Sequence, residues 1–194
     1  MRSQVNPNSL LEVIMDKLYK VLNSDGTSFW GGTGVWNLPH DNIPGVWMPP
    51  IKRPLALCKR GYHVLRFEHL LDWLGPSIFE VEVEGEMLWG YNKGVCSSAR
   101  LLRRLDAWND RNASLFTWDC ADRVRHLMNE QSKQAIDIAT AFEEDAASAK
   151  ETATAWVAAS AAAWAAGGAA AGAAAWAAER KWQTQRLKEI LGEN

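Results

Sequence analysis

Two histidines and a cysteine lie close together in the sequence and could bind a metal ion. Cys58, His63 and His69 supply the ligand types that zinc prefers. Their spacing, C-x4-H-x5-H, fits no standard zinc arrangement, and the segment offers no fourth ligand. We therefore expect no metal site here, only a buried cysteine and two ordinary histidines.

A row of alternating glutamates and a glycine-rich segment are two further candidates. The glutamates, residues 80, 82, 84 and 86, could serve acid–base chemistry, although an alternating strand more often turns such a row to solvent. Gly31–Gly34 reads Gly-Gly-Thr-Gly but lacks the Lys-Ser/Thr and the strand-to-helix context of a phosphate loop. The sequence leaves enzymatic activity uncertain and favours a protein that is not an enzyme and uses no cofactor.

Arginines concentrate in one stretch of the chain. Arg100, Arg103 and Arg104 could hold a phosphate or an acidic partner. The alternative is a surface stripe paired with Asp106 and Asp110. The whole chain has 21 basic and 23 acidic residues, a formal charge of -2, so we do not expect a nucleic-acid partner.

Tryptophan is unusually frequent, with 11 in 194 residues. Trp30, Trp36, Trp47 and Met48 lie in or beside a Gly- and Pro-rich loop and form the best candidate surface for a protein partner, because tryptophans dominate binding hot spots. The alternative is that these side chains close the core of a small sheet.

Hydrophobic periodicity predicts the elements that would position these residues. Strict alternation in 78–84 predicts a strand that turns Phe79, Val81 and Val83 to a core and continues to about residue 91. Further strands are expected at 18–22, 27–30 (as a hairpin with 18–22) and 55–58, and 100–105 fits either a last strand or a first helical turn. Helices are expected at 8–16, 67–74, 106–128, 132–142 and within 145–191.

These elements predict an α+β fold in two parts. Residues 1–100 form a small mixed domain with a mostly antiparallel sheet. Residues 101–194 form an Ala/Trp-rich helical domain, in which 106–128 buries Trp108, Leu115, Phe116, Cys120, Val124 and Leu127.

The segment between Glu151 and Glu179 contains no charged residue and is dominated by alanine. It is long enough to cross a bilayer, but alanine and glycine make it only weakly apolar, so we do not expect a membrane span. Small side chains let helices approach closely, and this predicts a homo-oligomer. The expected self-association residues are Trp156, Trp164, Gly168, Gly172 and Trp176, with Gly167–Gly168 either a helix break or a close crossing.

The number and spacing of the three cysteines indicate the cellular compartment. Cys58, Cys96 and Cys120 are an odd number without a CxxC pair, and the first residues lack an apolar export signal. We therefore expect a cytoplasmic protein.

Several segments resemble known families. The quoted stretches 18–26 (LYKVLNSDG), 58–63 (CKRGYH), 71–76 (LDWLGP), 80–86 (EVEVEGE) and 100–105 (RLLRRL), with Lys93, look like an uncharacterised domain of phage and bacterial proteins. From 115–124 (LFTWDCADRV) to Trp182, the chain resembles Ala-rich helical domains described as immunity proteins in bacterial conflict systems.

A third resemblance is to ADP-ribosyltransferases. Leu18-Tyr19, Gly61-Tyr62-His63 and the acidic strand 80–86 occur in the order of that family. The first strand carries Lys20 where the family has a nucleotide-contacting His or Arg. The sequence therefore departs from the family at a position that serves both cofactor binding and catalysis.

Two functions follow. The first is a non-enzymatic phage or prophage accessory protein that binds a protein partner, for example a counter-defence inhibitor of anti-CRISPR type or an immunity factor. The second is a nucleotide-binding or degenerate ADP-ribosyltransferase-like domain, including a sponge for a signalling nucleotide. Its expected ligand contacts are Tyr19, Tyr62, His63, Arg100, Arg103 and Arg104.

Overall fold

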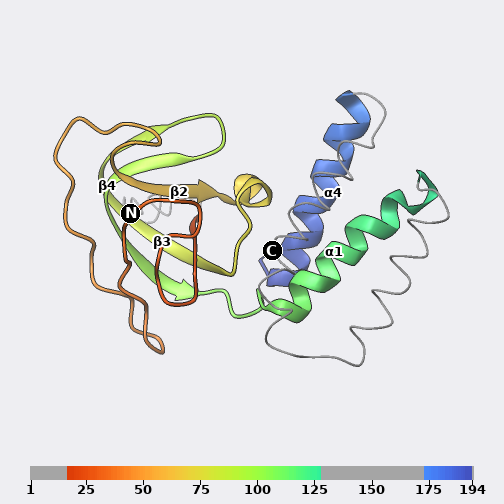
Figure 1. Cartoon of the computed structure of the whole chain (residues 1–194), viewed down its shortest axis with the longest axis horizontal. Helices are drawn as coiled ribbons and strands as arrows, with labels where there is room; N and C mark the ends of the chain where they lie inside the picture. The colour runs from red at the N-terminus through yellow and green to blue at the C-terminus, as the bar shows by residue number, and fades with distance from the viewer. Residues whose placement is uncertain (1–16, 128–172, 194) are drawn as a thin grey trace, which may run out of the picture.

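The computed structural model describes residues 17–127 and 173–193. Their elements, in chain order, are β1 (Leu18–Leu22), β2 (Tyr62–Arg66), the 3-10 helix η2 (Phe67–Asp72), β3 (Ser77–Trp89), β4 (Gly94–Arg104), α1 (Asp110–Val124), the 3-10 turn η3 (Arg125–Leu127) and α4 (Ala173–Leu191). The expected mixed α+β class is confirmed. The strands lie on one side of the molecule and α1 and α4 lie side by side on the other (Figure 1).

The four strands close into a small barrel in the order β1-β2-β4-β3, and every neighbouring pair is antiparallel. The long hairpin of β3 and β4 has irregular register between Glu80 and Val81 and between Glu84 and Met87. Such bulges bend and twist a strand, which allows a few strands to curl into a closed barrel.

The alternation of β3 has the predicted consequence. Phe79 and Val81 are buried inside the barrel, and Val83 packs against the same cluster. Val64 and Leu101 join them from β2 and β4. The full barrel core consists of residues Leu18, Leu22, Trp36, Met48, Val64, Phe79, Val81, Cys96, Ala99 and Leu101.

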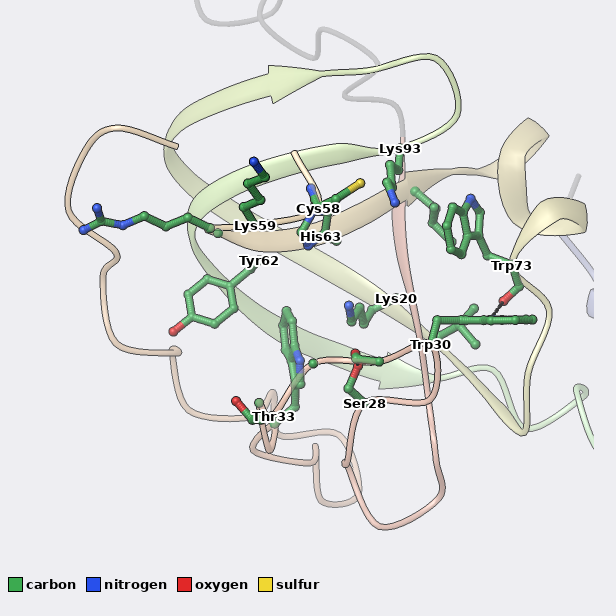
Figure 2. Close-up of a pocket in the computed structure, with 18 of the residues that line it drawn as sticks. Lys20, Ser28, Trp30, Thr33, Cys58, Lys59, Tyr62, His63, Trp73 and Lys93 are labelled. Atoms are coloured by element: carbon green, nitrogen blue, oxygen red, sulfur yellow. Dashed lines mark hydrogen bonds between the residues drawn. The ribbon is translucent and has the colours of Figure 1, made fainter. Parts of the chain in front are cut away.

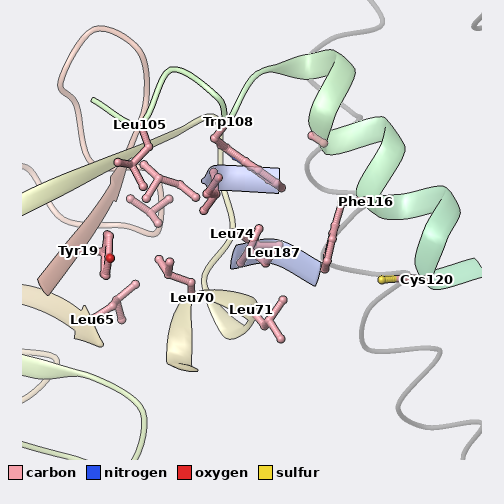
Figure 3. Packing of buried hydrophobic residues seen from close by; sticks show 14 residues of the cluster. Tyr19, Leu65, Leu70, Leu71, Leu74, Leu105, Trp108, Phe116, Cys120 and Leu187 are labelled. Atoms are coloured by element: carbon pink, nitrogen blue, oxygen red, sulfur yellow. The ribbon is translucent and has the colours of Figure 1, made fainter. Parts of the chain in front are cut away.

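A second cluster, the helix-side core, joins the outside of the barrel to the helices. Tyr19 and Val21 of β1 point into it, since alternate residues of a strand face opposite sides. Trp108, Phe116 and Leu187 belong to the same cluster, which Figure 3 shows. The barrel and the two helices therefore share buried side chains.

Local sequence explains where α1 begins. The side chain of Asn109 accepts a hydrogen bond from the backbone N–H of Asn112 at 3.1 Å, which caps the first turn. Phe116, Cys120 and Val124 then bury one face as predicted, whereas Leu115 is 38% exposed. Trp108 is buried just ahead of the helix, so the expected start at residue 106 is wrong by about one turn.

The Gly- and Pro-rich loop takes the place of a further strand beside β4. The backbone N–H groups of Gly45, Met48 and Ile51 donate to the carbonyls of Leu101, Ala99 and Ser97 at 2.8 to 2.9 Å. The spacing of three residues on one side against two on the other cannot form a regular ladder. The loop still supplies hydrogen-bond donors to the free carbonyls along the edge of β4. It also inserts Trp36 and Met48 into the barrel core.

Several expected elements differ in the structure. Residues 27–30 form only isolated bridges, so β1 is not half of a hairpin with them; it pairs with β2 and β3 instead. The expected strand 55–58 is a turn, and 67–72 is a 3-10 helix. Strand β2 was not predicted, and β4 settles residues 100–104 as strand.

The expected division after residue 100 falls inside β4. Helix is present from Ala173 to Leu191, in the last part of the expected 145–191 helix. The expected helices 8–16 and 132–142 lie outside the described residues, as do Trp156, Trp164, Gly168 and Gly172. Trp176 lies on α4 and is 36% exposed. Within 17–127 and 173–193, no helix has the length and apolar character needed to span a membrane.

Candidate functional site

A pocket opens where β1 and β2 move apart. The two strands pair only through Leu18 with Arg66 and Tyr19 with Leu65. Beyond this short contact lies a cavity of about 570 Å³, lined by both strands, the 28–36 segment, the 58–61 turn, Trp73 and Lys93 (Figure 2). The gap in the barrel wall gives the pocket access to inward-facing side chains.

The charge of the pocket wall is entirely positive. Lys20, Lys59, Arg60 and Lys93 line it, and no aspartate or glutamate does. None of the four makes an ion pair with a carboxylate in the described part of the chain. In a chain with more acidic than basic residues, this concentration of unneutralised charge favours an anionic ligand.

Aromatic rings form two walls of the same pocket. Trp36 and Tyr62 meet edge to face with ring centroids 5.4 Å apart, and Trp30 and Trp73 do so at 5.9 Å. The indole N–H of Trp30 donates to the carbonyl of Trp73 at 2.7 Å, which fixes its ring. Trp30 remains 49% exposed, so it offers an aromatic surface on which a flat ligand could stack.

Lys20 reaches the pocket from inside the barrel. It lies between Leu18 and Leu22 on β1, and both of these belong to the barrel core. Its ammonium nitrogen lies 5.2 Å from the centroid of the Trp36 ring. Burial, assisted by the nearby charge of Lys93, lowers the pKa of Lys20 to about 8.

His63 is a neutral group in this site. Its Nε2 accepts a hydrogen bond from the backbone N–H of Cys58 at 2.8 Å, which places the proton on Nδ1. Burial, together with the charges of Lys20 and Lys93, lowers the pKa of His63 to about 4. At neutral pH this histidine therefore adds no positive charge to the pocket.

Glycines shape the rim. Gly61 begins the approach to β2 with φ +127°, and a Cβ there would lie 2.2 Å from a methyl carbon of Val95. Gly31–Gly34 are exposed along the pocket, and no helix follows them. The segment is therefore not a phosphate loop of the known kind, as expected, but it does line the site.

The structure divides the expected nucleotide contacts into two groups. Tyr62 and His63 line the pocket. Tyr19 does not; it is buried in the helix-side core, with its hydroxyl 3.4 Å from a carboxylate oxygen of Glu193. The prediction that Tyr19 faces a ligand is therefore wrong, because its strand position turns it to the opposite side from Lys20.

The three arginines also lie outside the pocket. Arg100 pairs with Glu82 at 2.6 Å, and Arg103 pairs with Glu80 at 2.8 Å and with Glu193 at 2.6 Å. Arg104 lies 3.8 Å from Asp106. Each of the three already has a carboxylate partner and none lines the pocket, so phosphate binding by these arginines stays a prediction without support from the pocket.

The expected protein-binding residues are placed differently from one another. Trp36 is 5% exposed and Met48 7%, so the expectation of an exposed surface is wrong for these two; they close the barrel core. Trp47 is partly buried with the guanidinium of Arg100 4.9 Å from its ring centroid. Trp30 is exposed and belongs to the pocket.

Metal-binding geometry is absent from the described residues, where no group of three or more His, Cys, Asp or Glu side chains could hold an ion. The cysteines 58, 96 and 120 are unpaired. Burial raises the pKa of the Cys96 thiol to about 11, so this neighbour of Lys20 stays neutral.

Three contributions to the pocket were not predicted from the sequence, namely Lys93, Trp73 and residues 59–60. They come from two turns and a helix end far apart in sequence, and no local pattern joins them. Lys20 did leave a signal, because it interrupts the strand Leu-Tyr-Lys-Val-Leu at an inward position where an apolar residue is expected.

Comparison with known proteins adds no relative to this description. No family model, no curated protein and no solved structure matches the chain. The three resemblances stay predictions.

Proposed function

We propose that this protein binds a small anionic ligand that carries a flat ring, a nucleotide-like molecule, in the pocket between β1 and β2. The observation that carries this proposal is the wall of four basic and no acidic residues around a cavity of about 570 Å³. This volume lies in the range of small-molecule sites. The proposal corresponds to the nucleotide-binding alternative, with a largely different set of contacts.

Charge and shape assign the two ends of such a ligand. The charge of Lys93 lowers the pKa of Lys20, and the charges of both lysines lower the pKa of His63. An anion bound between the two lysines would relieve their repulsion. The exposed ring of Trp30 stands beside this positive region. A phosphate group therefore fits against the lysines while a base stacks on the indole.

Isothermal calorimetry with three probes tests the proposal. ADP carries both groups, adenosine carries only the ring and pyrophosphate carries only the charge. We expect ADP to bind more tightly than either fragment, and its affinity to fall as salt is added, since an ion-pair contribution is screened. Absence of ADP binding at millimolar concentration would refute a nucleotide-like ligand.

Two matched variants locate the site. Lys93→Gln removes one pocket charge, and we expect it to weaken ADP binding by roughly tenfold, about 1.4 kcal/mol. Lys52→Gln makes the same charge change at an exposed residue that does not line the pocket, and it should leave the affinity unchanged. Equal losses in both variants would show non-specific attraction instead of a site.

The protein-partner function is a second candidate, supported by a separate observation. The loop that covers β4 exposes Val35 at 62%, Ile43 at 69% and Val46 at 72%. Exposed apolar side chains on one loop are candidates for contact with a protein partner. The partner's identity, and a role in phage biology or counter-defence, stay predictions.

The variant Ile43→Ser/Val46→Ser tests this second candidate. Pull-down from a host lysate should lose a specific partner with the variant, while the midpoint of thermal unfolding stays within a few degrees of wild type. Trp36→Ala would not test it, since this side chain is buried and its loss is expected to cost about 3–5 kcal/mol of stability.

A further inference from the structure

Lys20 combines features that the binding of an anion does not require. Its side chain enters from an inward strand position, above the Trp36 ring, and ends in the open pocket (Figure 2). A lysine that only attracts anions works best at the rim, where water supports its charge. Here the charged form gives up hydration and gains no carboxylate among the described residues.

The groups that face Lys20 supply no counter-charge at neutral pH, because the thiol of Cys96 would favour the ammonium only as a thiolate. Lys93, from the turn between β3 and β4, is a second cation. His63, from β2, is neutral, and so is the Cys96 thiol of β4. With a pKa of about 8, Lys20 is on the order of one-tenth free amine at pH 7, whereas an ordinary lysine is below roughly one part in a thousand.

We propose that Lys20 forms a covalent imine with an aldehyde or ketone that also carries an anionic group. After its ammonium has lost a proton to solvent, the amine nitrogen attacks the carbonyl carbon. A C=N bond replaces the C=O bond, and the carbonyl oxygen leaves as water with the two remaining amine protons. Nothing is oxidised or reduced, and no further reactant is needed.

The rest of the pocket fits this class of ligand. Lys93, Lys59 and Arg60 remain available to hold the anionic group while Lys20 reacts as a neutral amine. Trp36 and Tyr62 flank the reacting end with apolar surface. The choice of an anionic carbonyl compound rests on the proposed anion-binding function, whereas the reactivity of Lys20 rests on its own placement.

Pyridoxal 5'-phosphate is a suitable probe, because it joins an aldehyde, a flat ring and a phosphate. The full chain is incubated with limiting probe at pH 7.5, reduced with borohydride to fix any imine, and digested for mass spectrometry. We expect the label at Lys20 to exceed that at the exposed Lys52 at least roughly tenfold, given the larger fraction of free amine. Labelling spread evenly over exposed lysines would overturn the proposal.

The pH profile supplies a second readout on the wild-type chain, so the test does not depend on a variant that folds. Labelling of Lys20 should level off just above pH 8, while labelling of Lys52 keeps rising toward pH 10. A Lys20 profile that follows Lys52 would overturn the proposal. Lys20→Arg, with its folding checked by circular dichroism, should lose the preferred site and keep the background label.

Pyridoxal without the phosphate separates this inference from the proposed function. Equal labelling of Lys20 by pyridoxal and by its phosphate, unaffected by Lys93→Gln, would support the imine and refute anion binding. If calorimetry shows that pyridoxal phosphate binds in a way that depends on Lys93, but borohydride leaves no label on Lys20, anion binding would be supported and the imine refuted. Preferential labelling by the phosphate, blocked by ADP, supports both.

Discussion

His63 and Lys20 are two basic side chains whose protonation the pocket controls. Burial is the first cause in both cases, and each also senses the charge of Lys93. The hydrogen bond from Cys58 fixes His63 as an acceptor at Nε2. Protonation of Nε2 would break this hydrogen bond, because an acceptor nitrogen cannot also carry a proton. Acidification is therefore expected to lower the free energy of unfolding.

The free energy of unfolding should therefore fall between pH 6.5 and 5 through His63. In this range the unfolded chain binds a proton at His63, whose usual pKa is 6.5, while the folded chain, with a pKa of about 4, does not. Stability thus rises with pH across the window. In His63→Gln, whose amide oxygen can still accept from Cys58, the urea midpoint should depend less on pH.

His40→Gln provides the control for this experiment. His40 is exposed, with 86% of its side chain accessible, so its replacement should leave the pH dependence of wild type in place. Parallel curves for wild type and His63→Gln between pH 6.5 and 5 would contradict a buried, neutral His63.

At the scale of elements, the end of α4 is tied to the barrel by one carboxylate. Gly192 turns the chain with φ +65° directly after the helix. Glu193 then accepts hydrogen bonds from Lys17 at 2.5 Å and from Arg103 at 2.6 Å. Burial opposes its ionisation, but the hydrogen bonds and charges of Lys17 and Arg103 outweigh burial and hold the pKa of Glu193 below its usual value.

Glu193→Gln should weaken this connection. The side chain of Glu193 is 8% exposed, and loss of its charge leaves Arg103 with a weaker partner, which we expect to cost about 1–3 kcal/mol. Hydrogen exchange of the last turns of α4 should accelerate. The effect should diminish as pH falls below the usual glutamate range, because Glu193 is then increasingly protonated in wild type as well.

Glu189→Gln is the matched control on the same helix. Glu189 is 49% exposed and pairs with Arg186 at 3.2 Å, and exposed pairs of this kind contribute about 0.3–0.5 kcal/mol. Exchange rates at the end of α4 that rise equally in both variants would contradict a specific role for Glu193.

At the scale of the whole molecule, the helix-side core makes the barrel and helices depend on each other. Leu187 of α4 is fully buried with Phe116 of α1 and with Leu70 and Leu71 of η2. Trp108 adds a hydrogen bond from its indole N–H to the carbonyl of Gly75 at 2.8 Å. Because these contacts cross the expected boundary between residues 100 and 101, the two parts should unfold together.

Leu187→Ala tests this coupling. Loss of a fully buried leucine is expected to cost about 2–5 kcal/mol. Hydrogen exchange of the amides of β3 and β4, which reports on the barrel, and of the amides of α1 and α4, which reports on the helices, should show one common and lowered urea midpoint. Gln185→Ala, at an exposed position of α4, should leave the midpoint near wild type.

Separate transitions would contradict a shared core. If the amides of α1 and α4 became exchangeable at lower urea while those of β3 and β4 kept the wild-type midpoint, the helices would be an independent unit. That result would favour the two-domain division at residue 100.

Patterns along the chain are enough to predict those elements whose signal is local. Strict alternation specified the inward side of β3, where Phe79 and Val81 are buried, and a periodic apolar face specified most of α1, although not its start after the Asn109 cap. Helix-favouring residues specified Ala173–Leu191. Such patterns are readable because each residue's environment follows from its near neighbours.

The closure of the barrel, the role of the loop and the position of the site depend on contacts between residues far apart in the sequence. Strand β2 carries Tyr62 and His63 in a short run that looks like a turn, and it becomes a strand by pairing with β1 and β4. Trp36 fills the barrel because the loop folds back over β4. The pocket joins Lys20, Arg60 and Lys93 from three separate segments, because long-range strand pairing, which no local pattern encodes, brings those segments to one gap in the barrel wall.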